Sequence, residues 1–490
     1  MTATLSRSAA AERFRDRPGR LLIDGELVDA ARGERFTVID PTTEEELGQV
    51  ARAGTEDVDR AVTAARAAFA DRRWSGLPRA RREAVLHRLA DLVEGATAEL
   101  AALDVLENGM PLAFAQYEIG SAVAMIRYFA GWPTKVESTV LATDDPIFGY
   151  TRREPVGVCA GIAPWNAPVT NPLLKIVPAL ACGNTVIAKP AEQTPLTAVR
   201  IAELCLEAGI PPGVVNVLQG PGDVGAALVA HPGVDKIAFT GSTATGKLIQ
   251  REAAATLKRV TLELGGKSPN ILFADADLEA AIPGALMAVF ANSGQVCFAG
   301  TRLFVERPIH DAVVEALAAG SAQMVVGDGF DPATQLGPLV SAAQFDRVRG
   351  YIEAGVAGGA TLAHGGDRVG DRGYFVRPTV FAGADNTMRI AREEIFGPVV
   401  TVIPFDDESE VLRLADDTNF GLGAGVWTRD LSRAHRVAAS LRAGVVWVNT
   451  YGDLSATVPF GGFKQSGIGR EFGTAALDAY TEHKSVLVKL

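Results

Sequence analysis

The sequence predicts an α/β protein with two doubly wound domains and a small β arm. The length of 490 residues suggests two or three domains at roughly 150 residues each. Short apolar runs alternate with helical patterns in two blocks, from about residue 157 and again over 268–448, as is typical of doubly wound parallel sheets. Two strand-like segments outside these blocks, 141–153 and 485–490, predict the arm.

The chain before the first block is predicted to be helical from residue 55 to about 130. Apolar residues recur every three or four positions between Val58 and Phe69, with Thr55 as the expected N-cap. The stretch 79–106 repeats this pattern and carries Arg and Glu on its other face.

The first block contains apolar runs that predict buried strands, each followed by a helical pattern. The expected strands are 156–162, 184–189, 214–218 and 236–239, and the expected helices are 173–181, 196–208 and 222–229. The second block is predicted to contain helices at 276–290, 308–319 and 342–356 and strands at 399–404 and 444–449. Because isolated strands are unstable, we expect the two arm segments to pair with each other or with a neighbouring subunit.

Composition excludes several classes of protein. Hydrophobic residues make up 48% of the chain, which is too many for a disordered protein, and the net charge of −11 is unlike that of a nucleic-acid binder. The start of the chain has no apolar signal segment, and the most apolar run, 281–291, is too short to span a bilayer. We therefore expect a soluble, cytoplasmic protein without nucleic-acid or membrane partners.

Cysteine and histidine usage predicts neither disulfides nor a metal site. The four cysteines are few and widely spaced, and Cys159, Cys182 and Cys205 lie in apolar stretches where a buried thiol is expected. The six histidines show no clustered spacing.

Two glycine-rich turns suggest phosphate binding without proving it. Residues 220–225 match GxGxxG between a strand and a helix, which fits either a dinucleotide-binding turn or a simple strand–helix turn. Residues 241–247 resemble a P-loop, but Leu248 stands where a hydroxyl would hold magnesium. A glycine-bounded turn at a helix N-terminus still suits a pyrophosphate.

Three polar residues stand in unusual surroundings. Asn166 follows an apolar strand, Glu263 lies between leucines ahead of two glycines, and Cys297 lies in a glycine-bracketed loop. Each also has an ordinary explanation: a capping Asn, a solvated Glu and a core Cys. Together they provide an oxyanion donor, a base and a nucleophile, which is the set that acyl chemistry through a thioester needs.

Seven motifs identify a resemblance that covers essentially the whole chain. The chain resembles the NAD(P)-dependent aldehyde dehydrogenase superfamily, whose motifs it carries in order: PWN at 164–166, KPAEQTP at 189–195, FTGS at 239–242, ELGGK at 263–267, GQVC at 294–297, EEIFGP at 393–398 and PFGGFKQSG at 459–467. The resemblance implies a Rossmann-like cofactor domain (1–135 and 154–264), a catalytic domain (265–466) and an oligomerisation arm (136–153 and 467–490). It also implies a homo-oligomer, either a dimer or a tetramer.

The resemblance assigns catalytic roles. Cys297 would attack the aldehyde to form a thiohemiacetal and, after hydride transfer to the nicotinamide, a thioester. The Asn166 amide and the Cys297 N–H would hold the oxyanion, and Glu263 would activate the hydrolytic water. Lys175 matches a family lysine near the active site.

The resemblance also implies NAD as the cofactor. A carboxylate at Glu192 accepts hydrogen bonds from ribose hydroxyls and repels a 2′-phosphate, although Lys189 leaves NADP open. The implied cofactor residues are Pro164, Trp165, Lys189, Glu192, Gly222, Gly241, Ser242, Gly265, Glu394 and Phe396.

The substrate pocket is predicted to be apolar and roomy. Ala167, Leu174 and Leu454 stand where relatives that oxidise betaine aldehyde carry aromatic residues, which leaves Phe298 and Phe460 as the expected aromatic wall. We therefore expect an aliphatic, terpenoid or aryl aldehyde. Two alternatives stay open: a CoA-acylating semialdehyde dehydrogenase, which typically lacks the base glutamate, and a catalytically silent structural protein on the same scaffold.

Overall fold

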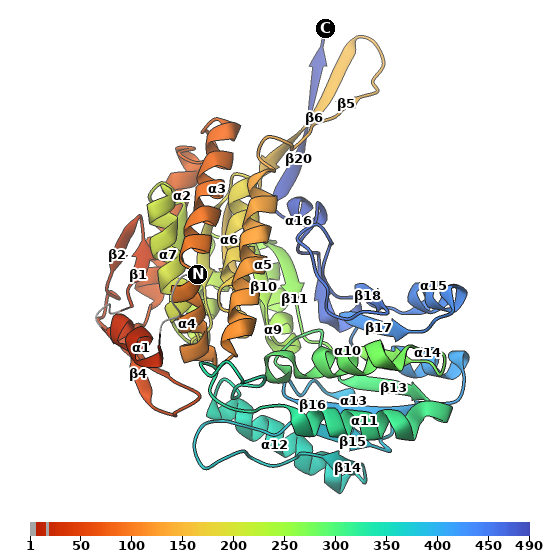
Figure 1. Cartoon of the computed structure of the whole chain (residues 1–490). Coiled ribbons are helices and arrows are strands. Elements are labelled where there is room, and N and C mark those ends of the chain that lie inside the picture. Colours follow the sequence, from red (N-terminus) through yellow and green to blue (C-terminus); the bar gives the residue numbers. More distant parts are fainter. Residues whose placement is uncertain (1–5, 16–18) are drawn as a thin grey trace.

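The computed structural model describes residues 6–15 and 19–490. Residues 1–5 and 16–18, which belong to the predicted cofactor domain, lie outside the described residues. The fold is α/β, with one eight-stranded sheet, one seven-stranded sheet and two small sheets, so the predicted fold class is confirmed. Figure 1 shows the larger sheet with its helices in the upper part, the second sheet below, and a narrow arm projecting from the top.

The eight-stranded sheet is doubly wound around its central strand. Its order is β19-β11-β10-β7-β8-β9-β1-β2. The chain adds β8 and β9 on one side of β7 and later β10 and β11 on the other, which creates the point where open α/β sheets bind ligands. The parallel strands are β7 (Val158–Ile162), β8 (Thr185–Lys189), β9 (Val215–Val217), β10 (Lys236–Thr240) and β11 (Arg259–Glu263), and β1 (Leu21–Ile23) and β2 (Glu26–Val28) form an antiparallel edge.

The four strands predicted for the first block are confirmed to within two residues at their ends, because strands buried on both faces appear as continuous apolar runs. The predicted helices are confirmed as well. They correspond to α6 (Thr170–Ala181), α7 (Leu196–Ala208) and α8 (Gly222–Ala230), with α9 (Thr243–Ala253) following β10.

Two details of the N-terminal helices differ from the prediction. Helix α2 (Thr55–Ala70) begins at Thr55, and its N-cap is Gly54, whose N–H donates to Asp57 Oδ2 at 3.0 Å. The predicted helix 79–106 is two helices, α3 (Arg79–Gly95) and α4 (Thr97–Asn108), which are separated at Ala96 after a glycine that is a poor helix former. Helix α5 (Leu112–Ala130) returns beside α3 toward the arm.

The second sheet has the order β14-β15-β16-β13-β12-β17-β18, in which only β14 is antiparallel. Its strands are β12 (Pro269–Leu272), β13 (Arg302–Glu306), β14 (Thr361–His364), β15 (Thr379–Ala382), β16 (Val399–Phe405), β17 (Gly423–Trp427) and β18 (Val445–Val448). Its helices are α10 (Leu278–Phe290), α11 (His310–Gln323), α12 (Ala342–Ala357), α13 (Arg389–Arg392), α14 (Glu408–Asp416) and α15 (Leu431–Ser440). The elements predicted for the second block are confirmed.

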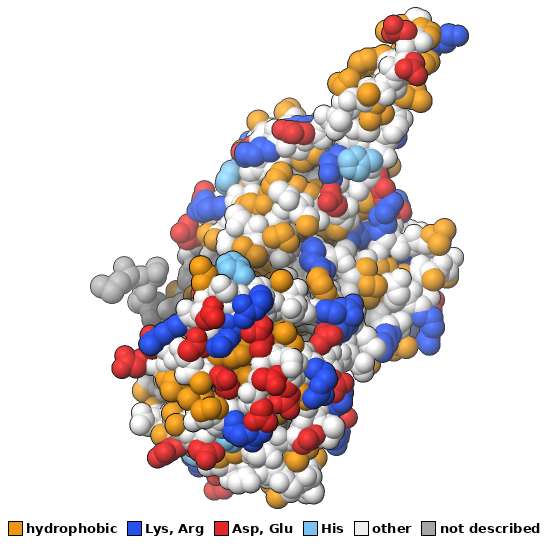
Figure 2. All heavy atoms as spheres, turned by 90° about the vertical axis from the view of Figure 1, so that its right-hand side faces the viewer, with side chains coloured by type: hydrophobic (Ala, Val, Ile, Leu, Met, Phe, Trp, Pro, Cys, Tyr) orange, Lys and Arg blue, Asp and Glu red, His pale blue; other side chains and the backbone are white. Residues whose placement is uncertain are grey.

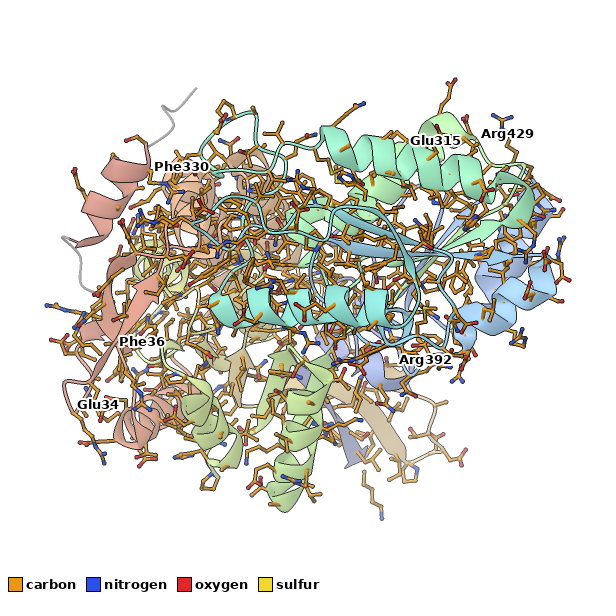
Figure 3. All side chains as sticks on the ribbon, turned by 90° about the horizontal axis from the view of Figure 1, so that it is seen from below. Glu34, Phe36, Glu315, Phe330, Arg392 and Arg429 are labelled. Atoms are coloured by element: carbon orange, nitrogen blue, oxygen red, sulfur yellow. The ribbon has the colours of Figure 1, made fainter. Side chains whose placement is uncertain are left out.

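The remaining elements lie at the periphery. The hairpin of β3 (Arg35–Ile39) and β4 (Glu46–Ala51) forms a separate small sheet. Seen from below, this hairpin, marked by Phe36, lies on the opposite side of the molecule from Glu315 on α11 (Figure 3). Two short helices, α1 (Arg7–Arg15) and α16 (Ala475–Asp478), lie near the ends of the chain.

The arm joins two segments far apart in the chain. Strand β6 (Ile147–Pro155) pairs antiparallel with β20 (Thr481–Lys489) along its whole length, and the short β5 (Val140–Leu141) adds a third strand. The predicted pairing of the two arm segments with each other is confirmed. Residues 467–468, which the sequence-based division places in the arm, form β19 at the edge of the eight-stranded sheet. The domain division itself stays a prediction.

Cys159, Cys182 and Cys205 are buried free thiols, as predicted. Across residues 6–15 and 19–490, no helix is long and apolar enough to cross a bilayer, and no cluster of His, Cys, Asp and Glu has the arrangement of a metal site.

Candidate active site

Four predicted site residues lie where the central strands of the eight-stranded sheet end. Asn166 follows β7, Lys189 ends β8, Gly241 follows β10 and Glu263 ends β11. Because these strands are parallel and adjacent, their carboxyl ends form one edge of the sheet. Cys297 reaches the same place from the second sheet, on the loop between α10 and β13.

The loop before Cys297 has an unusual backbone. Asn292, Ser293 and Gly294 all have positive φ angles, of 46°, 56° and 73°. For the two non-glycine residues this conformation costs about 1 kcal/mol or more each. Side-chain hydrogen bonds hold it in place: Asn292 Nδ2 donates to the Asn166 carbonyl at 2.9 Å and Ser293 Oγ to the Gly337 carbonyl at 2.8 Å. The loop is thus fastened to the segment that carries Asn166.

The Asn166 side chain is fixed at both ends. Its Nδ2 donates to the carbonyl of Gln295 at 3.0 Å, two residues before Cys297, and its Oδ1 accepts from Asn171 Nδ2 at 3.3 Å. The amide N–H groups therefore face the cysteine loop. This orientation suits a donor to an oxyanion formed at the cysteine.

Cys297 is partly buried and lines the cavity. Burial, helped by the carboxylates of Glu394 and Glu263, raises the pKa of its thiol above the ordinary range. The resting group is therefore the thiol, and attack on a carbonyl requires that its proton be removed.

Glu263 is a buried carboxyl without a hydrogen-bond partner. It is 3% exposed, and both of its oxygens lack partners in the described structure. Burial raises its pKa well above the ordinary value, and the nearby Glu471 raises it further, while Lys175 and Arg470 oppose the shift. A carboxyl whose pKa is raised by burial is a stronger base when ionised than an exposed carboxylate, which suits a general base.

Lys175 is fully buried beside this carboxyl. Its Nζ donates to Thr240 Oγ1 at 2.6 Å and forms an ion pair with Glu471. Both of its polar partners are side chains of the protein, Thr240 and Glu471. Lys175 therefore holds the Glu471 carboxylate in place. Glu471 is not among the predicted site residues, since nothing in its local sequence marks it as buried.

A cavity of about 410 Å³ is lined by Asn166, Glu263, Cys297 and Glu471, whereas Lys175 is not part of its lining. The predicted substrate residues Phe298, Leu174, Leu454 and Phe460 all line it. The expectation that Phe298 and Phe460 alone form the aromatic wall is wrong: the lining also includes Phe114, Trp165, Phe396 and Phe472, which come from segments far apart in the chain. Among the polar lining residues that the sequence analysis missed are Glu118 and Asn171.

A second cavity, of about 620 Å³, lies along the ends of β7, β8 and β10. It is lined by Pro164, Trp165, Lys189, Glu192, Gly222 and Gly241. Gly222, at the start of α8, has no atom within 4 Å of the place where a Cβ would stand, so the groove is open there. Ser242 caps α9 by accepting from the Thr245 N–H at 3.2 Å. The helix N-terminus and its glycines present the donors and the space that a pyrophosphate needs.

The two cavities meet at Trp165, which lines both. Its ring packs edge-on against Phe396, with centroids 5.2 Å apart. The segment around Phe396 is held by α12, where Gln344 Nε2 donates to the Phe396 carbonyl at 2.7 Å and Arg347 Nη2 to the Glu394 carbonyl at 2.6 Å. Gln344 and Arg347 are not among the predicted site residues, and no motif in the sequence marks them.

Glu394 is turned toward the glycines of the ELGGK motif. Its Oε1 accepts from the Gly266 N–H at 3.1 Å, and burial raises its pKa to about 7. A Cβ on Gly265 would lie 2.3 Å from Glu394 Oε2, so any larger residue here would displace the Glu394 carboxyl from this position. Ser242, Gly265, Glu394 and Phe396 all line the cavity that holds Cys297.

The aldehyde dehydrogenase family model matches residues 27–486. The chain belongs to this family. The predicted resemblance is confirmed, as are the predictions of an oxidoreductase and of an aldehyde dehydrogenase of class EC 1.2.1.

Relatives across kingdoms share this family's sequence over nearly the full length. An aldehyde dehydrogenase of Alternaria alternata is 48% identical over 478 residues, which cover 97% of this chain and 96% of the relative. Retinal dehydrogenase 2 of Mus musculus is 47% identical and covers 96% of this chain and 92% of the relative. Among solved structures, an NAD+ complex of an aldehyde dehydrogenase from Bacillus cereus has a TM-score of 0.97 and 48% identity and covers 100% of both chains.

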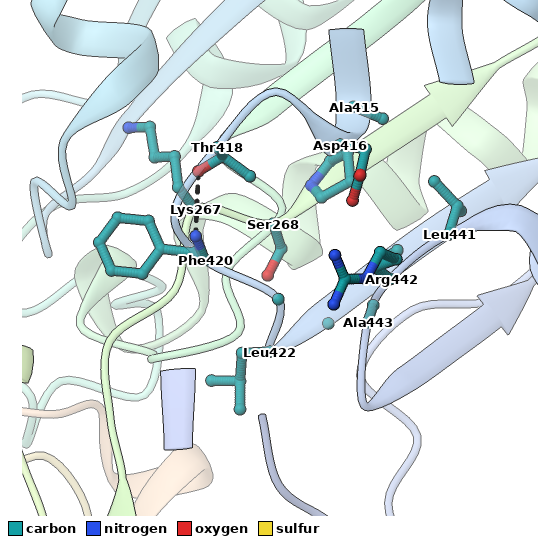
Figure 4. A pocket seen from close by; sticks show the side chains of 14 residues that line it. Lys267, Ser268, Ala415, Asp416, Thr418, Phe420, Leu422, Leu441, Arg442 and Ala443 are labelled. Atoms are coloured by element: carbon teal, nitrogen blue, oxygen red, sulfur yellow. Dashed lines mark hydrogen bonds between the residues drawn. The ribbon is translucent and has the colours of Figure 1, made fainter. Parts of the chain in front are cut away.

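The lysine of the family motif ELGGK lies behind the active site. Lys267 is 1% exposed, its Nζ has no hydrogen-bond partner in the described structure, and burial, with Arg302 nearby, lowers its pKa to about 7. Figure 4 shows it beside Ser268 at a small cavity of about 10 Å³, with its ammonium directed away from Arg442. A cavity of this size holds about one water molecule.

Proposed function

We propose that this aldehyde dehydrogenase family member oxidises an apolar aldehyde to the carboxylic acid with NAD, through a thioester on Cys297. One observation carries the proposal. The cavity that contains Cys297 also contains Asn166 and the unpartnered carboxyl of Glu263, and it meets the second, glycine-lined groove at Trp165.

The chain's own residues account for each step. The Glu263 carboxylate accepts the Cys297 Sγ proton and passes it to solvent, and Sγ bonds to the carbonyl carbon. The Asn166 amide with the Cys297 N–H holds the resulting oxyanion of the thiohemiacetal. Loss of hydride from that carbon leaves the thioester. Glu263 then takes a proton from water while the water oxygen attacks the thioester. The carbon–sulfur bond breaks and releases the carboxylic acid.

The residues of the second groove fit NAD. When bound, NAD supplies the hydride acceptor. Gly241 and Ser242, at the N-terminus of α9, would bind the pyrophosphate, with Gly222 nearby. Glu394 would bind the nicotinamide ribose. The NAD+ complex of the Bacillus cereus relative supports this choice.

The preference for NAD over NADP is assigned to Glu192. Its carboxylate lines the groove, 3.4 Å from Lys189 Nζ, and its side chain is 40% exposed. A 2′-phosphate placed here meets one negative and one positive charge, so NADP binds more weakly without being excluded.

The lining of the cavity supports an aliphatic, terpenoid or aryl aldehyde. The small side chain of Ala167 and the non-aromatic side chain of Leu174 leave the cavity wide, and the aromatic side chains form apolar walls. The relatives named retinal dehydrogenase are 46–47% identical to this chain, and the two structures of a betaine aldehyde dehydrogenase from Staphylococcus aureus are 39% identical. The higher identity to the retinal dehydrogenases supports an extended apolar aldehyde over a quaternary ammonium aldehyde as the substrate.

We also propose that the arm joins copies of the chain into a dimer or tetramer. Apolar side chains are exposed on it, among them Val140 at 68%, Leu487 at 63% and Leu490 at 84%. Figure 2 shows orange side chains gathered along the projecting arm. Such a surface is unfavourable in water unless a partner covers it. Light scattering of the native protein tests this, and a monomeric mass contradicts it.

NADH absorbance tests the enzymatic proposal with decanal, a terpenoid aldehyde, benzaldehyde and betaine aldehyde, each with NAD and NADP. We expect NADH and free acid with the apolar aldehydes and no activity from Cys297→Ala, while Cys205→Ala, a buried control, stays active. Activity of Cys297→Ala would refute the mechanism. Acyl-CoA as product would favour the acylating alternative, and equal kcat/KM for betaine aldehyde and decanal would refute the substrate class.

A further inference from the structure

A large basic cavity lies at the base of the arm, away from the catalytic cavity. It measures about 670 Å³ and shares no lining residue with the two cavities of the active site. It opens between the C-terminal end of α2, the N-terminal end of α3 and the strands β6 and β20. Figure 1 shows α2 and α3 beside the foot of the arm. Five arginines line it, Arg72, Arg79, Arg82, Arg152 and Arg153, with a single acidic residue, Glu154.

Within the described residues, most of this positive charge is not ion-paired, although Arg72 and Arg152 lie near enough to Glu154 to interact with its charge. Glu154 is ion-paired with Lys484, and Arg153 with Asp478 at 2.6 Å. The other four arginines form no ion pair within the part of the chain that the structure describes. Like charges held together around a cavity repel one another, so an anion placed among them is stabilised.

Arg82 is the strongest sign that a ligand belongs here. It is 7% exposed, and its Nε is buried without a partner in the described structure. The hydrogen bond that its Nη1 donates to the Ala181 carbonyl is long, at 3.5 Å. A buried guanidinium without a carboxylate is costly. Gly183 lies against it with φ of 93°, and a Cβ there would be 3.0 Å from Nη1, so the facing backbone offers no side chain to pair with it.

The start of α3 adds donors to the same cavity. This helix has 17 residues, and its N-cap, Pro78, provides no side chain to cap it. Pro78 and Arg79 both line the cavity. The first N–H groups of a helix point along its axis and favour an anion.

From these observations we infer that the cavity binds a small polyanion carrying two or more phosphate or carboxylate groups. Several separate guanidinium groups match several anionic groups, and the planar fork of arginine suits the oxygens of phosphate and carboxylate. The volume lies within the range of small-molecule sites. Because Arg79 and Arg82 belong to α3 and Arg152 to β6, the ligand links the body of the molecule to the arm.

Calorimetry with inorganic pyrophosphate and, in a second arm, citrate tests the inference on the native oligomer. Saturating NAD fills the cofactor groove during the titration. We expect saturable binding of one ion per chain, weakened at least tenfold in Arg79→Gln/Arg152→Gln and lost in Arg82→Gln. Arg81→Gln is the matched control, because Arg81 is exposed on the same helix outside the cavity and its loss leaves binding unchanged.

The double variant keeps the test valid if Arg82→Gln fails to fold, since Arg79 and Arg152 are exposed. Tighter binding of pyrophosphate than of citrate assigns the site to phosphates, and the reverse order assigns it to carboxylates. The inference is overturned if neither ion gives saturable binding to the native protein. That result is expected if an acidic segment of a second copy of the chain fills the cavity. It is also overturned if Arg79→Gln/Arg152→Gln binds like the control.

Discussion

Lys175 and Glu471 act on Glu263 with opposite signs, which makes the proposed base testable by two single substitutions. Lys175 opposes the rise in the Glu263 pKa, and Glu471 adds to it. Lys175→Met leaves the Glu471 charge alone beside Glu263, so Glu263 stays protonated up to a higher pH. The acidic limb of the kcat profile then moves to higher pH. Glu471→Gln leaves Lys175 alone, so the limb moves to lower pH.

The size of both effects follows from burial. At an effective dielectric constant of about 20, two unit charges about 6 Å apart interact by about 3 kcal/mol, and we expect partial screening to leave a shift of about one pKa unit. Lys175 is fully buried and the Glu471 side chain is 10% exposed. Removing one member of a buried ion pair costs about 3–5 kcal/mol of stability, so both single variants melt at lower temperature.

The assay measures kcat as a function of pH under conditions where hydrolysis of the thioester limits the rate. A burst of NADH before the steady state shows that this condition is met. Lys175→Met/Glu471→Gln is the control: with both charges removed, the limb returns toward that of the unsubstituted protein and part of the stability is recovered. If the two single variants shift the limb in the same direction, or leave it in place, Glu263 is not the titrating base.

Three further predictions concern the loop, a buried carboxyl and the tunnel. Gly294→Ala places a Cβ 2.1 Å from the Gly397 carbonyl at a φ of 73° and abolishes activity with a lower melting temperature. Gly350→Ala, in the exposed middle of α12 with no atom within 4 Å, leaves activity unchanged and does not lower the melting temperature, because alanine favours a helix. Burial raises the pKa of Glu118 to about 7, so its contribution to stability is lost as pH rises through that value. At about pH 8, Glu118→Gln therefore increases the free energy of unfolding by up to about 3 kcal/mol, which a higher melting temperature reveals. At about pH 5 the increase is much smaller. Ala167→Phe narrows the cavity and lowers kcat/KM for benzaldehyde about tenfold relative to acetaldehyde, and equal losses for both would contradict the tunnel.

Much of the fold could be predicted because the local sequence carries the information. The strands of the first block are buried on both faces, and their apolar runs mark them without reference to the rest of the chain. Strand β19 has only two residues, and its pairing with β11 depends on the return of the chain after the second sheet. No local pattern announces such a strand. The break at Ala96 was missed because the apolar periodicity continues across it.

The site could be predicted in part for a related reason. Glu263 and Cys297 stand in sequences whose residue types are hard to explain by packing, so they attract notice. Glu471 and Glu118 gain their importance from burial against distant elements, which only the folded chain shows. The aromatic wall was incomplete in the prediction for the same reason, because Phe114 and Phe472 reach the cavity from segments that no motif covers.

The pairing of β11 with β19 has a consequence for the synthesis of the protein. The Leu264 N–H donates to the Ser466 carbonyl at 2.9 Å, and Ser466 Oγ donates to the carbonyl of Gly265, 201 residues away in the chain. The chain therefore leaves the eight-stranded sheet beside Glu263, forms the whole second sheet, and returns to the same place at Ser466. Until the chain after the second sheet has been made, the edge of β11 that ends at Glu263 lacks its pairing strand. A nascent or truncated chain that ends before residue 467 therefore contains Cys297 and Glu263 but lacks β19, and we expect full activity only from the complete sheet.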